Sequence, residues 1–107
     1  MLTAIVKNPL VIHIMRGELR VGSVQQTRHD GTWTSLAMSA ASRGSRKGHT
    51  TPAQAAQARW GAAGRKAVER AVLVGEYMTI LKDAYPNESE RRRVAEGCAD
   101  EFDAGIV

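Results

Sequence analysis

Residues 11–38 read VIHIMRGELRVGSVQQTRHDGTWTSLAM, and this stretch decides the fold. Two turn signals divide it. Arg16–Gly17 favours a tight turn because glycine accepts a positive φ, and Asp30–Gly31 is a favoured pair at the tip of a hairpin. The divided stretch predicts three successive β-strands, at about residues 11–15, 18–26 and 32–38.

The second of these runs alternates in character, as expected of a strand with two different faces. Its alternation assigns Arg20, Gly22 and Val24 to one face. The run from Leu2 to Val6 predicts a fourth strand at an edge of the sheet, where the proline that follows interrupts no ladder.

A long helix is predicted from the segment Thr51-Pro52-Ala53-Gln54 onward. Threonine suits the N-cap, proline the first helical position, and glutamine three residues later can complete a capping box. Gly61 and Gly64 each weaken this helix by roughly 1 kcal/mol relative to alanine. The sequence leaves open one helix with close packing at the glycines or two helices with a kink. The helix should end before Pro86.

A second helix begins after Asn87, a good N-cap, and should end near Ala104. The order of elements predicts an α+β fold with an N-terminal antiparallel sheet of three or four strands, followed by two or three helices. We expect one domain over residues 1–107, with a basic β-rich part at 1–50 and a helical part at 51–105.

The charge is unevenly distributed along the chain, although the whole carries +4 with a pI near 9.7. Residues 1–66 hold ten Lys/Arg and two Asp/Glu, whereas residues 67–107 hold five and nine. A basic half joined to an acidic half indicates a polyanion-facing surface on a separate support, and nucleic acid is the first partner to consider. The arginines at 91–93 lie among acids, so local pairing on a solvated helix face is expected there.

No catalytic, metal or cofactor pattern stands out. The single cysteine, Cys98, rules out an internal disulfide and multi-cysteine zinc sites, and it fits a reducing compartment. The histidines His13, His29 and His49 have no spacing typical of a metal site. No apolar run reaches the length of about 20 residues that crosses a membrane. We therefore expect a cytoplasmic protein without enzymatic activity, cofactor or membrane partner.

Cations gather around the predicted sheet and in the loop that follows it, at residues 40–50. One face of a small sheet packs on a helix and leaves the other free, and arginines on such a face can grip phosphates or read guanine. These cations are expected to line one edge of the free face. The candidate nucleic-acid contacts are Arg16, Arg20, Arg28, Arg43, Arg46, Lys47 and His49.

Three short motifs follow one another along the chain: Asp-Gly-Thr-Trp at residues 30–33, Ser-Arg-Lys-Gly-His at 45–49, and Thr-Pro-Ala-Gln-Ala-Ala at 51–56. Over residues 11–60 the chain resembles the small DNA-binding modules built of three strands and a helix, such as AP2-like domains and the arm-binding domains of phage integrases. The chain departs from that pattern at Gln54, where an acid is usual, and it has no recombinase catalytic domain. The resemblance implies DNA contacts by Arg20, Arg28, Arg46 and Lys47.

Two functions remain open. The first is a non-enzymatic accessory protein of a phage or plasmid that docks its basic surface on nucleic acid, most simply duplex DNA, with salt-sensitive affinity. The second is an inhibitor that binds a host defence complex, as anti-CRISPR proteins do. A continuous basic groove would favour the first, and an exposed apolar patch rimmed by charge the second. The acidic helices could also form a homodimer.

Overall fold

The computed structural model describes residues 1–38 and 46–103 of the chain. The chain divides into two compact units, Met1–Glu69 and Arg70–Val107. The first unit holds ten Lys/Arg and three Asp/Glu, and the second holds five and eight. The change of charge in the sequence thus follows the structural division to within three residues. Organisation as a single domain stays a prediction.

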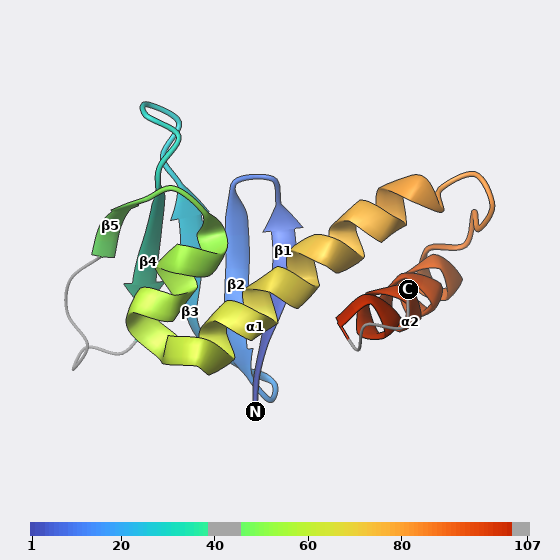
Figure 1. Ribbon diagram of the computed structural model, residues 1–107, viewed down its shortest axis with the longest axis horizontal. Coiled ribbons are helices and arrows are strands. Elements are labelled where there is room, and N and C mark those ends of the chain that lie inside the picture. The colour runs from blue at the N-terminus through green and yellow to red at the C-terminus, as the bar shows by residue number, and fades with distance from the viewer. Residues whose placement is uncertain (39–45, 104–107) are drawn as a thin grey trace. The chain divides into compact units, whose positions relative to one another are not determined.

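The first unit contains a five-stranded antiparallel sheet in the order β1-β2-β3-β4-β5, so each strand lies beside its predecessor in the sequence (Figure 1). The predicted α+β fold, an N-terminal antiparallel sheet followed by helices, is confirmed. The sheet has more strands than expected because residues 46–49, predicted as loop, pair with β4. The strands are β1 (Leu2–Asn8), β2 (Val11–Arg16), β3 (Leu19–Gln26), β4 (Trp33–Ala37) and β5 (Arg46–His49).

Both predicted turns form around a glycine with positive φ, 63° at Gly17 and 72° at Gly31. In the second turn the Asp30 carboxylate accepts hydrogen bonds from the backbone N–H of Thr32 at 3.0 Å and from its hydroxyl at 2.7 Å. These two bonds lower the pKa of Asp30. Because the chain reverses at every turn, the two glycines lie at opposite ends of the sheet.

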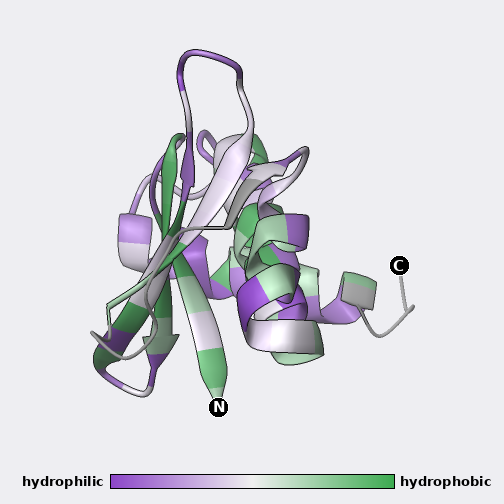
Figure 2. Ribbon diagram, turned by 90° about the vertical axis from the view of Figure 1, so that its left-hand side faces the viewer, coloured by the Kyte–Doolittle hydropathy of each residue, from purple (hydrophilic) through white to green (hydrophobic). Residues whose placement is uncertain are grey.

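One face of the sheet carries the core of the first unit and packs against the beginning of α1, which lies on one side of the sheet (Figure 2). The small side chains on the helix allow it to approach the strands closely. The buried apolar residues of this unit are Ile12, Ile14, Val24, Trp33, Ala55, Ala56 and Val68.

A bulge changes the face on which Arg20 lies. Ile14 pairs with Gly22 but Met15 pairs with Arg20, so β3 holds one residue more than β2 at this point. An extra residue in one strand reverses the alternation beyond it. The predicted grouping of Arg20 with Gly22 and Val24 is therefore wrong, and Arg20 lies on the face turned away from the core.

Helix α1 spans Pro52–Ile80 and begins at the predicted cap. The hydroxyl of Thr51 accepts a hydrogen bond from the backbone N–H of Gln54 at 3.1 Å. The expected return bond of the capping box goes one residue further back, because the Gln54 side-chain oxygen accepts from the N–H and hydroxyl of Thr50 at 3.3 and 2.6 Å. The side-chain oxygens of Thr51 and Gln54 thus both accept hydrogen bonds at the start of the helix.

The helix is kinked at Gly61, whose φ of 67° and ψ of −157° are not helical. Of the two alternatives left open by the sequence, the structure has two helical segments joined at this glycine. Arg65 Nη1 donates to Gln57 Oε1 across the kink at 2.9 Å. In a straight helix these two residues would be separated by about 12 Å along the axis.

Two other glycines make room for Trp60. An added Cβ at Gly64 would lie 2.6 Å from the Cβ of Trp60. On β3, a Cβ at Gly22 would lie 2.5 Å from Cζ2 of the Trp60 ring and would also meet the carbonyl oxygen of Leu36. The tryptophan ring thus packs on bare backbone at the centre of the sheet.

The second unit contains the part of α1 from Arg70 onward, together with α2 (Glu88–Asp103). The predicted cap is confirmed, since Asn87 Oδ1 accepts the Glu90 N–H at 3.0 Å. The apolar core lies on Val74, Ala95 and Ala99. Over the described residues, neither helix is long and apolar enough to span a bilayer. The predicted end near Ala104 lies just outside the described residues.

Arg91 has a structural role in this unit. Its guanidinium donates to the carbonyl oxygen of Tyr85 at 2.8 Å and to that of Pro86 at 3.0 Å. The side chain therefore satisfies two carbonyls of the segment that connects α1 to α2. Local pairing with neighbouring acids is predicted for the arginines at 91–93, and the hydrogen bonds of Arg91 go to the backbone instead.

Candidate nucleic-acid interface

The sheet face turned away from α1, called the open face here, is rich in hydrogen-bonding side chains. Cross-strand partners share a face. The members of the open face are therefore Val11, His13 and Met15, which share one side of β2, and the residues paired with them on the neighbouring strands. Six of the ten carry polar groups and none is acidic. The open face consists of Thr3, Ile5, Val11, His13, Met15, Arg20, Ser23, Gln25, Thr34 and Leu36.

Arg20 supplies the one Lys or Arg side chain among the ten residues of the open face. Its Nη1 lies 3.2 Å from Nε2 of His13, and its Nη2 donates to the sulfur of Met38 at 3.6 Å. These contacts hold an exposed guanidinium extended over the surface of β2, β3 and the end of β4. An arginine fixed in this way loses less conformational freedom when it binds a phosphate or a base edge.

The pairing with Arg20 needs a neutral His13. Partial burial lowers the pKa of His13, and the positive charges of Arg20 and Lys7 lower it further. An ordinary histidine titrates near 6.5, and the lowered pKa of His13 favours the neutral ring at pH 7. With its proton on Nδ1, the ring accepts from Arg20 through Nε2.

The acids of the first unit do not neutralise this face. Asp30 is bound by Thr32 inside the β3–β4 turn, and Glu69 pairs with Arg65 on α1 at 3.0 Å. Glu18 lies in the β2–β3 turn. The ten residues of the open face thus include the cation Arg20 and no carboxylate, a balance that favours phosphate.

Apolar side chains surround the polar group. Ile5 is 49% exposed and Met38 57% exposed, while Met15 and Leu36 are half-buried. The open face thus presents a basic group with apolar side chains around it, and it does not form a continuous basic groove. Such a surface suits the sugar and base edges of a nucleic acid as well as its phosphates.

The structure separates the predicted contact residues. Arg16 and Arg20 lie at the end of the sheet that holds the β2–β3 turn, whereas Arg28 lies in the β3–β4 turn at the other end. All three are exposed. His49 lies on β5 opposite Trp33 and is half-buried. The expectation that the cations line one edge of the face is therefore wrong, because antiparallel turns alternate between ends.

Three candidates come from the basic segment after β4. Arg43 lies outside the described residues. Arg46 and Lys47 belong to β5, the edge strand, and only their backbone is described. The pairing of this segment with β4 places its backbone at the sheet edge opposite β1.

Two basic residues of the site escaped the sequence reasoning. His13 was weighed only as a metal ligand, and Lys7 was counted only in the charge balance of residues 1–66. The alternation Ile12-His13-Ile14 was the available signal, because it places the histidine on the face opposite two core isoleucines. Arg59, by contrast, donates to the hydroxyl and carbonyl of buried Ser35 at 3.4 Å and supports the core.

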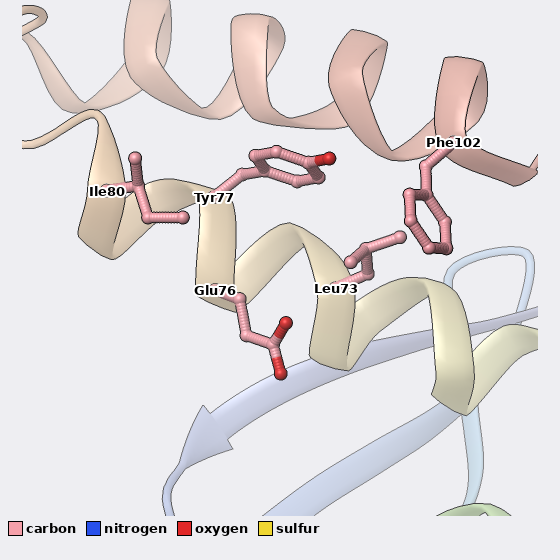
Figure 3. A pocket seen from close by; sticks show the side chains of 5 residues that line it. All are labelled: Leu73, Glu76, Tyr77, Ile80 and Phe102. Carbon is pink, nitrogen blue, oxygen red and sulfur yellow. The ribbon is translucent and has the colours of Figure 1, made fainter. Parts of the chain in front are cut away.

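The second unit has a different surface feature, an open apolar hollow of about 260 Å³. Figure 3 shows Phe102 reaching from α2 toward Leu73 of α1, with Glu76 at the rim. Phe102 is 55% exposed and Ile80 74% exposed. Exposed large apolar side chains beside charge are typical of a protein-binding surface.

No group of three His, Cys, Asp or Glu side chains lies close enough in residues 1–38 and 46–103 to hold a metal ion. Cys98 is a free, half-buried thiol on α2. The arrangement can bind and position a partner through charge, hydrogen bonds and apolar contact.

Comparison with protein-family models, with curated proteins and with solved structures found no match. The resemblance to three-stranded DNA-binding modules accordingly stays a prediction. The function of the chain is therefore inferred from its residues and their geometry.

Proposed function

We propose that this chain is a non-enzymatic nucleic-acid-binding protein, an accessory factor of the kind found in phages and plasmids, that docks the open face of its sheet on duplex DNA. The observation that carries the proposal is the extended guanidinium of Arg20, held between His13 and Met38 on a face without acids. The positive balance of the first unit supports it.

Docking would begin with long-range attraction between the first unit and the phosphates. The major groove is about 12 Å wide and admits two strands, so only part of the five-stranded sheet, which spans about 19 Å, would enter it. Arg20 would then reach a base edge or phosphate from the end of the sheet that holds the β2–β3 turn. Arg28, in the turn at the other end of the sheet, would contact the backbone. Arg16 alternates with Met15 and so lies on the side of Ile12 and Ile14, away from this contact.

The test is the salt dependence of binding to a fluorescent duplex, measured by anisotropy for the wild type, Arg20→Ala and Arg28→Ala. Each lost phosphate contact should reduce the slope of log K against log salt by about 0.9. If Arg20 reads a base, its loss should weaken binding roughly five- to a hundredfold. The triple variant Arg43/Arg46/Lys47→Ala measures the contribution of the basic segment.

Arg92→Ala is the matched control, because it removes the same charge from an exposed position on α2. It should change affinity only slightly. An equal loss in Arg92→Ala and Arg20→Ala would assign the binding to net charge and overturn the open face as the site. Absence of binding at low salt would overturn the function.

The hollow of the second unit favours a second candidate, an inhibitor of a host defence complex. Exposed Phe102 and Ile80 are the observation behind it. Cells that carry the defence system and express the chain should then become permissive to phage. Phe102→Asp should abolish this effect while Arg20→Ala keeps it, and the reverse pattern would favour the open face.

A further inference from the structure

The two edges of the sheet differ in how well they are protected from pairing. β1 is a seven-residue strand that pairs only with β2 among the described strands, and it reads LTAIVKN (Figure 1). Its Ile5 and Val6 are 49% and 40% exposed, and they point to opposite faces. A long apolar edge with unpaired backbone N–H and C=O groups is a template for another strand.

The opposite edge has features that discourage pairing. β5 has four residues, among them Arg46, Lys47 and a glycine with a φ of 83°. Its register with β4 is irregular between Trp33 and Ser35. Short length, cations and irregular pairing are devices by which natural sheets protect an edge. β1 has two of them, Lys7 and a register shift between Val6 and Asn8, and both lie near its C-terminal end, which leaves Leu2–Val6 unprotected.

We propose that β1 pairs antiparallel with β1 of a second copy about a two-fold axis at Ile5, so that two sheets join into one of ten strands. Ile5 is the middle residue of β1, so an axis at Ile5 is the placement that pairs all of Leu2–Asn8 with the second copy. In this register Ile5 faces its own copy on the open face, Ala4 faces Val6 on the core side, and Lys7 faces Thr3. No like charges oppose each other, and the exposed apolar side chains of both faces are covered.

The contact is small. Two seven-residue strands bury less than the 1,200–2,000 Å² typical of stable complexes, so a weak dimer is expected. Sedimentation velocity of the wild type should show a monomer–dimer equilibrium between about 10 and 500 µM. Ile5→Lys, which sets two ammonium groups against each other at the axis, should abolish it. Leu19→Lys is the matched control, since Leu19 is 69% exposed at the β2–β3 turn.

Register is tested by cross-linking in a Cys98→Ser background. Paired Cα atoms in antiparallel strands lie about 4.5–5.5 Å apart, within reach of a disulfide. Ile5→Cys should therefore form covalent dimers under mild oxidation. Thr3→Cys should not, because Thr3 and its copy would be four residues out of register, about 13 Å apart. A mixture of Thr3→Cys and Lys7→Cys should cross-link.

Three results would overturn the inference: a wild type that stays monomeric over the whole concentration range, a dimer that survives Ile5→Lys, or equal cross-linking of Ile5→Cys and Thr3→Cys. A dimer insensitive to Ile5 would point to the helices of the second unit instead. None of these measurements contains DNA, so their outcome is independent of the proposed function. Tryptophan fluorescence confirms that each variant is folded, because Trp33 lies in the sheet.

Discussion

Replacing Gly61 with L-alanine should destabilise the first unit, although the new methyl group would meet no atom within 4 Å. The loss comes from the backbone alone. A φ of 67° with a ψ of −157° is a region that L-residues avoid, and such strain costs about 1–3 kcal/mol. For a unit of 60–100 residues, this corresponds to a fall of about 4–24 °C in the midpoint of thermal unfolding.

D-alanine at the same position should have the opposite effect. The mirror image of the Gly61 conformation is the polyproline II region, which L-residues adopt readily, so D-alanine fits the kink without strain. A β-carbon also restricts the unfolded chain, which stabilises the fold by about 0.4–1 kcal/mol. The two variants have the same atoms and differ only in the handedness of one carbon.

The assay is urea unfolding of full-length chains assembled from synthetic segments. Trp33 and Trp60 both belong to the first unit, so tryptophan fluorescence reports the unit that contains the kink. The free energy of unfolding should fall for L-alanine and stay equal or rise for D-alanine. A shift in the same direction for both variants, or an unchanged midpoint for L-alanine, would refute backbone strain as the reason for this glycine.

Three further changes test the packing, the cap and the site. Gly22→Ala should lower the free energy of unfolding by about 1–3 kcal/mol in urea, because its Cβ would meet the Leu36 carbonyl and the Trp60 ring. Asn87→Ala should lower the free energy of unfolding by about 1 kcal/mol, measured by thermal circular dichroism, because the Glu90 N–H loses its acceptor. An NMR titration should place the pKa of His13 below its ordinary value, and Arg20→Gln should raise it by removing a nearby cation. Since the folded-state pKa is the lower one, His13 contributes stability above the ordinary histidine pKa, and this is lost as the pH falls toward the folded value.

Local signals in the sequence predicted most of the architecture. Gly17 and Gly31 defined the turns, and Asn87 and Thr51 defined the helix starts, because each of these preferences acts within a few residues. The fifth strand was missed since Arg46-Lys47-Gly48-His49 has no strand-like pattern and its pairing depends on β4. The choice between one helix and two at Gly61 stayed open because glycine fits either alternative, and the sequence does not give the backbone angles that the structure shows there.

The candidate site was harder to predict because it depends on which residues share a face. The bulge at Val21 moved Arg20 to the open face, and a single extra residue leaves no mark in the composition of β3. Without the bulge, the guanidinium would face the core side and could not meet His13. The separation of Arg16 from Arg28 follows from the meander, which alternates its turns between two ends.

Pairing through β1 and binding through Arg20 make a joint prediction about cooperativity. Arg20 lies in the row of Thr3 and Met15, two residues from the Ile5 axis along the strand and five strand spacings from its copy across the sheet. With about 3.4 Å per residue and 4.8 Å per strand, the two Arg20 backbones lie about 28 Å apart, which is close to the 34 Å helical turn that separates half-sites on one face of DNA. Two copies would then bind adjacent half-sites together. Ile5→Lys should remove this cooperativity in titrations of duplex DNA while single-copy binding remains, and Arg20→Ala should weaken both. If Ile5→Lys left the binding curve unchanged, the two sites would act independently and the joint interpretation would fail.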